Sequence, residues 1–168
     1  MSKETQKQLI ITGPEEGETL AVAGSNYRII LTGEQTAGKL AIVELNVPPN
    51  SGPIPHEHPA IQESFYVLEG AVELKSKTQT YIAKKGAIVT IPFDGPVHSF
   101  KNTGDTQAKL LCIVTPAGLD DFFREIGTPI SFGEIPQGGI SDEQKEKMKE
   151  AAVRYGQELY PPDYFENE

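Results

Sequence analysis

Residues 55–70 read Pro-His-Glu-His-Pro-Ala-Ile-Gln-Glu-Ser-Phe-Tyr-Val-Leu-Glu-Gly. His56 and His58 are two residues apart, and in an extended chain this spacing places both imidazoles on the same face. Glu63 follows at the start of an apolar run that ends at Gly70, a pattern typical of a strand closed by a turn. Imidazole nitrogens and one carboxylate oxygen suit a transition metal, so this stretch predicts a metal-binding strand.

A second stretch contains the third and last histidine of the chain. Residues 86–102 read Gly-Ala-Ile-Val-Thr-Ile-Pro-Phe-Asp-Gly-Pro-Val-His-Ser-Phe-Lys-Asn, in which the histidine is His98. Phe100 lies two residues further on, so in a strand it shares a face with His98. All three histidines of the chain are therefore candidate ligands of one site.

Together the two stretches resemble the two metal-site motifs of the cupin superfamily. The first motif is His-x-His, four residues, Glu, six residues and Gly. The second runs from Gly through Pro and a Gly turn to His and Asn. The matching residues of this chain are His56, His58, Glu63, Gly70, Gly86, Pro92, Gly95, His98 and Asn102. The close resemblance covers about residues 52–102, with a looser match over about 27–126.

This resemblance implies that each chain binds one divalent transition metal, which could be Fe, Mn, Ni, Co, Cu or Zn. His56, His58, Glu63 and His98 would be its ligands. Four protein ligands leave two positions open on an octahedral metal, as a catalytic site requires. The alternative is a barrel of the same shape in which the histidines only form hydrogen bonds. The histidines of a metal site need partners that fix their tautomers, and the candidates are Gln62, Asn102 and Tyr27.

Composition narrows the class of partner. Asp and Glu number 24 against 15 Lys and Arg, which gives a formal net charge of -9. This charge disfavours nucleic acid and anionic membranes as partners. No apolar run approaches the length of a membrane span, and residues 1–7 lack the apolar core of a signal peptide. The single cysteine, Cys112, fits a small buried residue, so we expect a cytoplasmic protein without an intrachain disulfide.

Short apolar runs separated by Gly or Pro predict an all-β fold. With the cupin resemblance, we expect a jelly-roll barrel (a double-stranded β-helix) over about residues 8–116, with its first strand at residues 8–12. The pattern then becomes helical at residues 119–126, and Ser141 begins a capping box for a second helix. The stripe expected on that second helix is Met148, Ala152, Tyr155 and Leu159.

The expected architecture is thus a single domain over residues 1–168, with one or two C-terminal helices in an extension over about 118–160. The sequence from Gly118 to Phe123 also resembles the start of the helix that follows the barrel in small quercetinase-like cupins. The strand after Glu63 is apolar on both faces. If Glu63 points inward, Tyr66 and Leu68 lie outside and need a cover. We expect a homodimer in which a partner covers this face or the N-terminal strands, with packing within one chain as the alternative.

Three functions are compatible with this sequence. The first is a metal-dependent dioxygenase resembling quercetinase, which cleaves a flavonol or another enolizable small molecule. Glu63 would be both a ligand and the catalytic base, or a ligand only. Glu57 would point away from the histidines. The second is a non-catalytic protein that binds a metal or a small ligand, and the third is a metal-dependent isomerase of a sugar or small carbonyl compound. Aromatic side chains that could line a substrate pocket are Phe65, Phe93, Phe100, Phe122 and Phe123.

Overall fold

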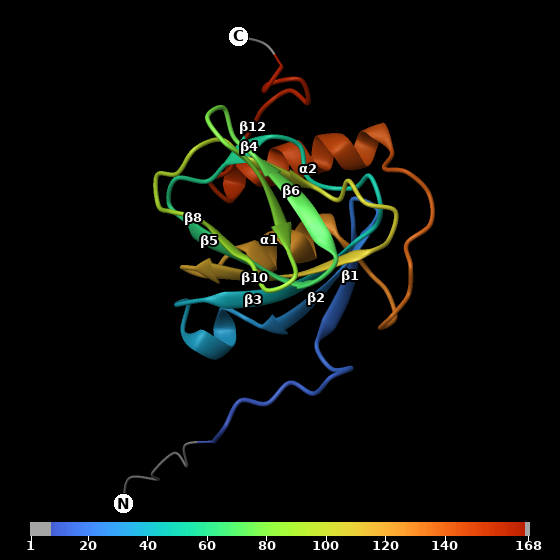
Figure 1. Ribbon diagram of the computed structural model, residues 1–168. Coiled ribbons are helices and arrows are strands. Elements are labelled where there is room, and N and C mark those ends of the chain that lie inside the picture. Colours follow the sequence, from blue (N-terminus) through green and yellow to red (C-terminus); the bar gives the residue numbers. More distant parts are fainter. Residues whose placement is uncertain (1–7, 167–168) are drawn as a thin grey trace, which may run out of the picture.

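A computed structural model describes residues 8–166 (Figure 1). The expectations for residues 1–7 and 167–168, including their place in a single domain, lie outside the described residues. Strands dominate the described part of the chain, and their bounds are β1 Glu18–Val22, β2 Ser25–Leu31, β3 Ala41–Val47, β4 His56–Glu57, β5 Gln62–Glu69, β6 Ala71–Lys75, β7 Thr80–Lys84, β8 Ile88–Ile91, β9 Ser99–Lys101, β10 Ala108–Thr115, β11 Thr128–Pro129 and β12 Glu158–Leu159.

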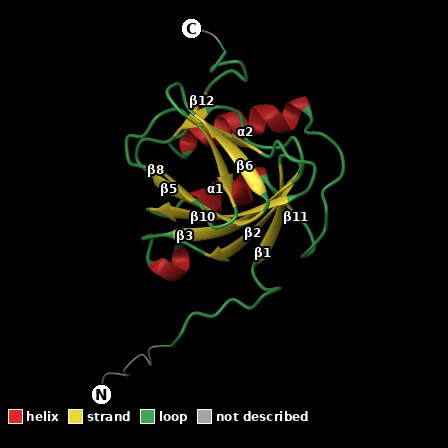
Figure 2. Ribbon diagram, in the orientation of Figure 1, coloured by secondary structure: helices red, strands yellow, loops and turns green. Residues whose placement is uncertain are grey.

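These strands form a jelly-roll barrel, as predicted. The largest sheet has the order β11-β1-β2-β3-β10-β5-β8, and a three-stranded sheet has the order β7-β6-β9. Figure 2 shows that the sheet containing β6 lies opposite the large sheet. A third, two-stranded sheet pairs β12 with β4. A short 3-10 helix, Glu34–Thr36, lies between β2 and β3.

Alternation along the strands decides which side chains face the barrel interior. In β3 and β10, buried residues alternate with partly exposed ones, which is the period of a strand with one face in the core. In β5, Glu63, Phe65 and Val67 are buried, whereas Tyr66 is 38% exposed. Glu63 therefore points inward beside Phe65, and Tyr66 points outward, as the sequence predicts.

Two helices follow the barrel. Helix α1, Leu119–Ile126, has the predicted bounds and packs against β1 and β3 of the large sheet. Helix α2, Asp142–Arg154, begins with the predicted capping box, in which Ser141 Oγ accepts a hydrogen bond from the Gln144 backbone N–H. None of the described helices is long and apolar enough to cross a membrane.

The predicted helical stripe is wrong at its C-terminal end, because α2 stops at Arg154. Gly156 then adopts a φ of 72°, in the left-handed region that commonly ends helices. The chain leaves the helix axis and continues into β12, which pairs with β4 (Figure 1). Leu159 is therefore a strand residue beside His56, its partner in the register.

The predicted strand at residues 8–12 is absent, since these residues have no strand partner in the described chain. Leu9, Ile10 and Ile11 are 86%, 55% and 76% exposed. A strand needs the edge of a neighbouring strand to pair with. The first segment of the described chain that pairs in this way is β1, with β2 and β11 as its neighbours. Three adjacent exposed apolar side chains are a candidate contact for a second copy of the chain.

We propose that the outer face of β5 is the contact surface of a homodimer. Tyr66 pairs in register with Leu111 of β10 and Ile88 of β8, and Ile88 is 60% exposed.

We expect light scattering at tens of micromolar to give twice the chain mass of 18.3 kDa. Tyr66→Lys should shift the protein toward the monomer, because it places a charge in the apolar contact. Tyr81→Lys serves as the control, because Tyr81 is 52% exposed and lies on β7 of the three-stranded sheet. A monomeric wild type would contradict this expectation.

Candidate metal centre

Four buried side chains meet inside the barrel: His56 from β4, His58 just after it, Glu63 from β5 and His98 just before β9. Their potential ligand atoms all lie within 4.8 Å of one another. The imidazole centroids are 4.5 to 5.6 Å apart. The structure thus brings together all the predicted metal ligands, at a spacing that can hold a single metal ion.

Backbone hydrogen bonds bring these residues together. His56 and His98 form an isolated antiparallel bridge, in which each backbone N–H donates to the carbonyl of the other, at 3.0 and 2.9 Å. The Ile61 N–H donates to the His58 carbonyl at 3.1 Å, so the chain turns back after the second histidine. This turn starts β5 at Gln62, and Glu63 is the first residue of β5 to face the histidines.

The outer nitrogens of the imidazoles contact backbone carbonyls. His56 Nδ1 lies 2.9 Å from the Ile54 oxygen, and His98 Nδ1 lies 3.0 Å from the Pro96 oxygen. His58 Nδ1 has a longer contact of the same kind, 3.3 Å from the Ile61 oxygen. Because a carbonyl only accepts hydrogen bonds, each Nδ1 carries a proton, and Nε2 is left to bind a metal.

The side chains expected to fix these tautomers do not contact the outer nitrogens of the histidines. Asn102 donates to the carbonyls of Val47 and Thr106, so it ties the loop between β9 and β10 to the end of β3. Gln62 is partly exposed at the start of β5, and Tyr27 lines the cavity described below. This prediction was wrong because backbone carbonyls already occupy the outer nitrogens.

One buried nitrogen of the cluster lacks a hydrogen bond. His98 Nε2 is buried and forms no hydrogen bond within residues 8–166, although Glu63 Oε2 lies 3.5 Å away. Buried polar atoms nearly always have a partner. A metal ion would supply this partner, so the four residues fit the metal that the motif implies.

The electrostatics of the metal-free cluster center on Glu63. Burial would raise its pKa, but the contacts with His58 and His98 outweigh burial and hold the pKa of Glu63 below its usual range. Burial alone would lower the pKa of His58, but the hydrogen bond to Glu63, at 3.0 Å, leaves that pKa raised. Burial, followed by the neighbouring His98, lowers the pKa of His56 to about 4. Glu63 is therefore ionised, and a metal bound to His58 Nε2 would replace the hydrogen bond between His58 and Glu63.

Cys112 contacts this site, which the sequence analysis did not predict. Its Sγ donates to Glu63 Oε1 at 3.1 Å. Burial, together with the carboxylate, raises the pKa of Cys112 well above its usual range, so it remains a thiol that can donate. The contact orients one carboxylate oxygen away from the histidines and leaves Oε2 facing them.

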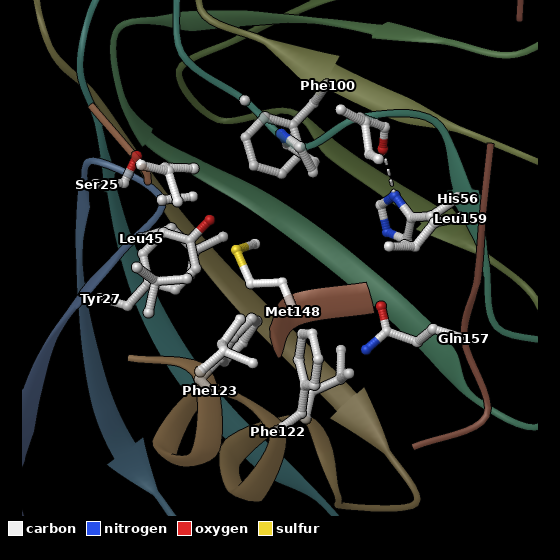
Figure 3. A pocket seen from close by; sticks show the side chains of 18 of the residues that line it. Ser25, Tyr27, Leu45, His56, Phe100, Phe122, Phe123, Met148, Gln157 and Leu159 are labelled. Atoms are coloured by element: carbon white, nitrogen blue, oxygen red, sulfur yellow. Dashed lines mark hydrogen bonds between the residues drawn. The ribbon is translucent and has the colours of Figure 1, made fainter. Parts of the chain in front are cut away.

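A cavity of about 490 Å³ opens beside the cluster, and His56 and Glu63 form part of its wall (Figure 3). Four of the predicted phenylalanines line it, namely Phe65, Phe100, Phe122 and Phe123. Phe93 is not among the lining residues and is 51% exposed, because it lies in the loop after β8. The predicted place of Phe93 in the pocket is therefore wrong.

Glu57 points away from the histidines, as predicted, and accepts a hydrogen bond from the Tyr160 hydroxyl at 2.8 Å. Other cavity residues that the sequence analysis did not assign to a pocket come from α2 and the residues after it, Met148 and Gln157 among them (Figure 3). The capping box predicted α2, but it could not predict that the helix lines the cavity beside the metal centre.

Comparison with known proteins supports the resemblance to cupins. Residues 43–114 match a family model described as Cupin domain, and this range contains all four members of the cluster. Quercetin 2,3-dioxygenase of Bacillus subtilis (strain 168) is 26% identical over 114 residues, which cover 68% of this chain and 33% of that protein. An uncharacterized protein of Methanocaldococcus jannaschii is 32% identical over 78 residues, which cover 46% of this chain and 62% of that protein.

The matched region is thus less than two thirds of the length of either curated relative. Among solved structures, KdgF from Halomonas sp. is similar, with a TM-score of 0.59 and 16% identity over 68% of this chain and 99% of that chain. At this identity, the similarity shows a shared fold alone.

We predict about one transition metal per chain in the purified wild-type protein. The double variant His56→Ala/His98→Ala should lose nearly all of it, because two of four ligands are removed. Glu57→Gln, on the same strand but facing away, should keep the wild-type content. Elemental analysis of the three proteins measures this, and equal metal content in the double variant and the wild type would contradict the assignment.

The pKa of His56 predicts how acid affects the metal-free protein. This pKa is about 4 in the folded state and near 6.5 when unfolded, so the unfolded chain takes up the proton first. The free energy of unfolding should therefore fall as the pH drops from 6.5 to 4, by on the order of 3 kcal/mol from this residue.

Urea unfolding of metal-free wild type and His56→Gln at both pH values checks this effect. The wild type should lose more stability than the variant. His58 contributes with the opposite sign, because its pKa is raised, but it is present in both proteins. Equal losses in the two proteins would show that His56 is not held neutral by the fold.

Proposed function

Because this chain belongs to the cupin superfamily, we propose that it is a metal-dependent dioxygenase resembling quercetinase. Its substrate would be a flavonol or another enolizable small molecule. One observation carries the proposal: a buried cluster of three imidazoles and one carboxylate borders an apolar cavity of about 490 Å³. This volume is within the usual range for small-molecule sites.

The residues that would hold the metal are His56, His58, Glu63 and His98, because their ligand atoms converge and His98 Nε2 has no partner in the described chain. When bound, a divalent transition metal supplies Lewis acidity toward an enol oxygen and redox chemistry toward dioxygen. The histidines are held ready for this role, since each outer nitrogen is already engaged by a backbone carbonyl.

The walls of the cavity favour a flat, largely apolar ligand. The rings of Phe65 and Phe100 meet edge to face at 5.1 Å, and Phe122 lies 5.6 Å from Phe123. Aromatic walls of this kind exclude water, which protects reactive intermediates. Lys145 and Lys149 also border the cavity, but each is paired with a carboxylate of α2, at 2.9 and 2.7 Å. A charged pocket, which would favour the isomerase alternative, has little support.

Glu63 is the proposed proton acceptor. It borders the cavity, and its lowered pKa keeps it ionised at neutral pH. A carboxylate within hydrogen-bond reach of a substrate can take the proton of an acidic enol hydroxyl. In the overall reaction the enol loses that proton to Glu63, both atoms of dioxygen enter the products of ring cleavage, and Glu63 returns the proton to a product. The Cys112 thiol holds the side chain in place throughout, through Oε1.

We predict that the metal-loaded wild type consumes oxygen when a flavonol such as quercetin is added. Glu63→Gln should lower the rate by roughly 100-fold or more, because the amide can still coordinate but cannot accept the proton. Oxygen uptake is measured with an electrode on proteins of equal metal content. Glu57→Gln is the matched control, since its side chain faces Tyr160, and it should keep the wild-type rate.

Two outcomes would contradict parts of this proposal. A metal-loaded Glu63→Gln protein with the wild-type rate would show that Glu63 is a ligand only. A metal-loaded wild type that binds flavonols but consumes no oxygen with any of them would contradict the dioxygenase activity and favour the non-catalytic binding protein.

A further inference from the structure

Gln157 has an unusual position for a polar side chain. It is only 7% exposed, and its Nε2 forms no hydrogen bond within the part of the chain that the structure describes. A buried amide N–H without a partner destabilises the structure, because it has lost its hydrogen bond to water. The side chain lines the cavity beside the metal centre, on the same wall as His56 and Leu159 (Figure 3). A group bound in the cavity is the natural partner for this donor.

The backbone fixes Gln157 from both sides. Its own N–H donates to the Ala152 carbonyl at 2.8 Å, which ties it to the end of α2. The next residue, Glu158, pairs with Glu57 of β4, and the Tyr160 N–H donates to the Pro55 carbonyl at 2.9 Å. Because β4 also carries His56, the carboxamide and the metal ligand are held by the same pair of strands.

The surroundings of the carboxamide restrict what can pair with it. Phe122, Met148 and Leu159 are among its apolar neighbours in the cavity wall (Figure 3). On the opposite wall, Tyr27 borders the cavity and makes an edge-to-face contact with Phe123 at 5.0 Å. A ligand that fills this space has an apolar, planar body, and near the metal it needs an acceptor oxygen for Nε2.

We propose that Gln157 donates a hydrogen bond from Nε2 to a carbonyl or enolate oxygen of the bound molecule. Gln157 thereby selects planar aromatic ketones over hydrocarbons of the same shape. This inference rests on the proposed function of the cavity as a small-molecule site and identifies the residue that recognises the ligand oxygen. Discrimination of this kind is strong in an apolar site, because an acceptor-free ligand leaves the buried donor unpaired.

Anaerobic binding of two probes to the metal-loaded protein tests the proposal without turnover. The probes are 3-hydroxyflavone, which has a carbonyl oxygen, and 2-phenylnaphthalene, which has a similar shape and no acceptor. Gln157→Met keeps the length of the side chain and removes the donor. It should raise the Kd of 3-hydroxyflavone about tenfold and leave the Kd of 2-phenylnaphthalene unchanged or lower.

Gln137→Met is the matched control, because Gln137 is exposed and donates to the Ile135 carbonyl. It should change neither Kd. Gln157→Glu provides a second variant of nearly the same shape, whose carboxylate cannot donate and repels the ligand oxygen. It should raise the Kd of 3-hydroxyflavone more than Gln157→Met does. Circular dichroism of each variant verifies that it is folded.

Three results would overturn the proposal. The first is an unchanged Kd of 3-hydroxyflavone in both Gln157 variants. The second is an equal loss of affinity for both probes in these variants, and the third is a wild type that binds neither probe. An equal loss would mean that Gln157 only shapes the cavity. By contrast, selective binding that depends on Gln157, in a wild type without oxygen uptake, would support the proposal and contradict the dioxygenase activity alone.

Discussion

Burial of a carboxylate among three imidazoles is the constraint on which the rest of this structure depends. Glu63 is 4% exposed and His58 is 2% exposed. Moving such groups out of water is costly unless they are paired with one another or with a metal. The barrel meets this requirement by placing the histidines around a single carboxylate oxygen, Oε2, while Cys112 binds the other. Within this cluster, His98 Nε2 is buried without a hydrogen bond to any of residues 8–166, and it marks where a cation would fit.

The C-terminal extension completes the site as well as covering the barrel. Helix α1 supplies Phe122 and Phe123 to the cavity wall, and α2 supplies Met148. Beyond α2, the pairing of β12 with β4 fixes residues 158–159 against the strand that carries His56. The cavity is thus formed from both the barrel and the extension, and Gln157 lies where the two meet.

The metal ligands could be predicted because their identity lies in short-range spacing. His56, His58 and Glu63 share one stretch, and His98 was the only histidine left to join them. The bounds of α1 were predictable for a similar reason, since its apolar residues repeat at helical spacing. The contact between Cys112 and Glu63 spans 49 positions and depends on β10 pairing with β5, which no local pattern encodes. Residues 8–12 show the same limit, because an apolar run does not reveal whether a strand edge is available to it.

X-ray absorption spectroscopy of the cobalt-loaded protein identifies the atoms bound to the metal. We expect three imidazole nitrogens and carboxylate oxygen, without sulfur, and we expect 3-hydroxyflavone to change the spectrum when it is added under anaerobic conditions. Fewer imidazoles, or sulfur bound to the metal, would contradict the assignment of Glu63 and the histidines. A spectrum that stays the same while the flavonol is bound would contradict the claim that the metal faces the cavity.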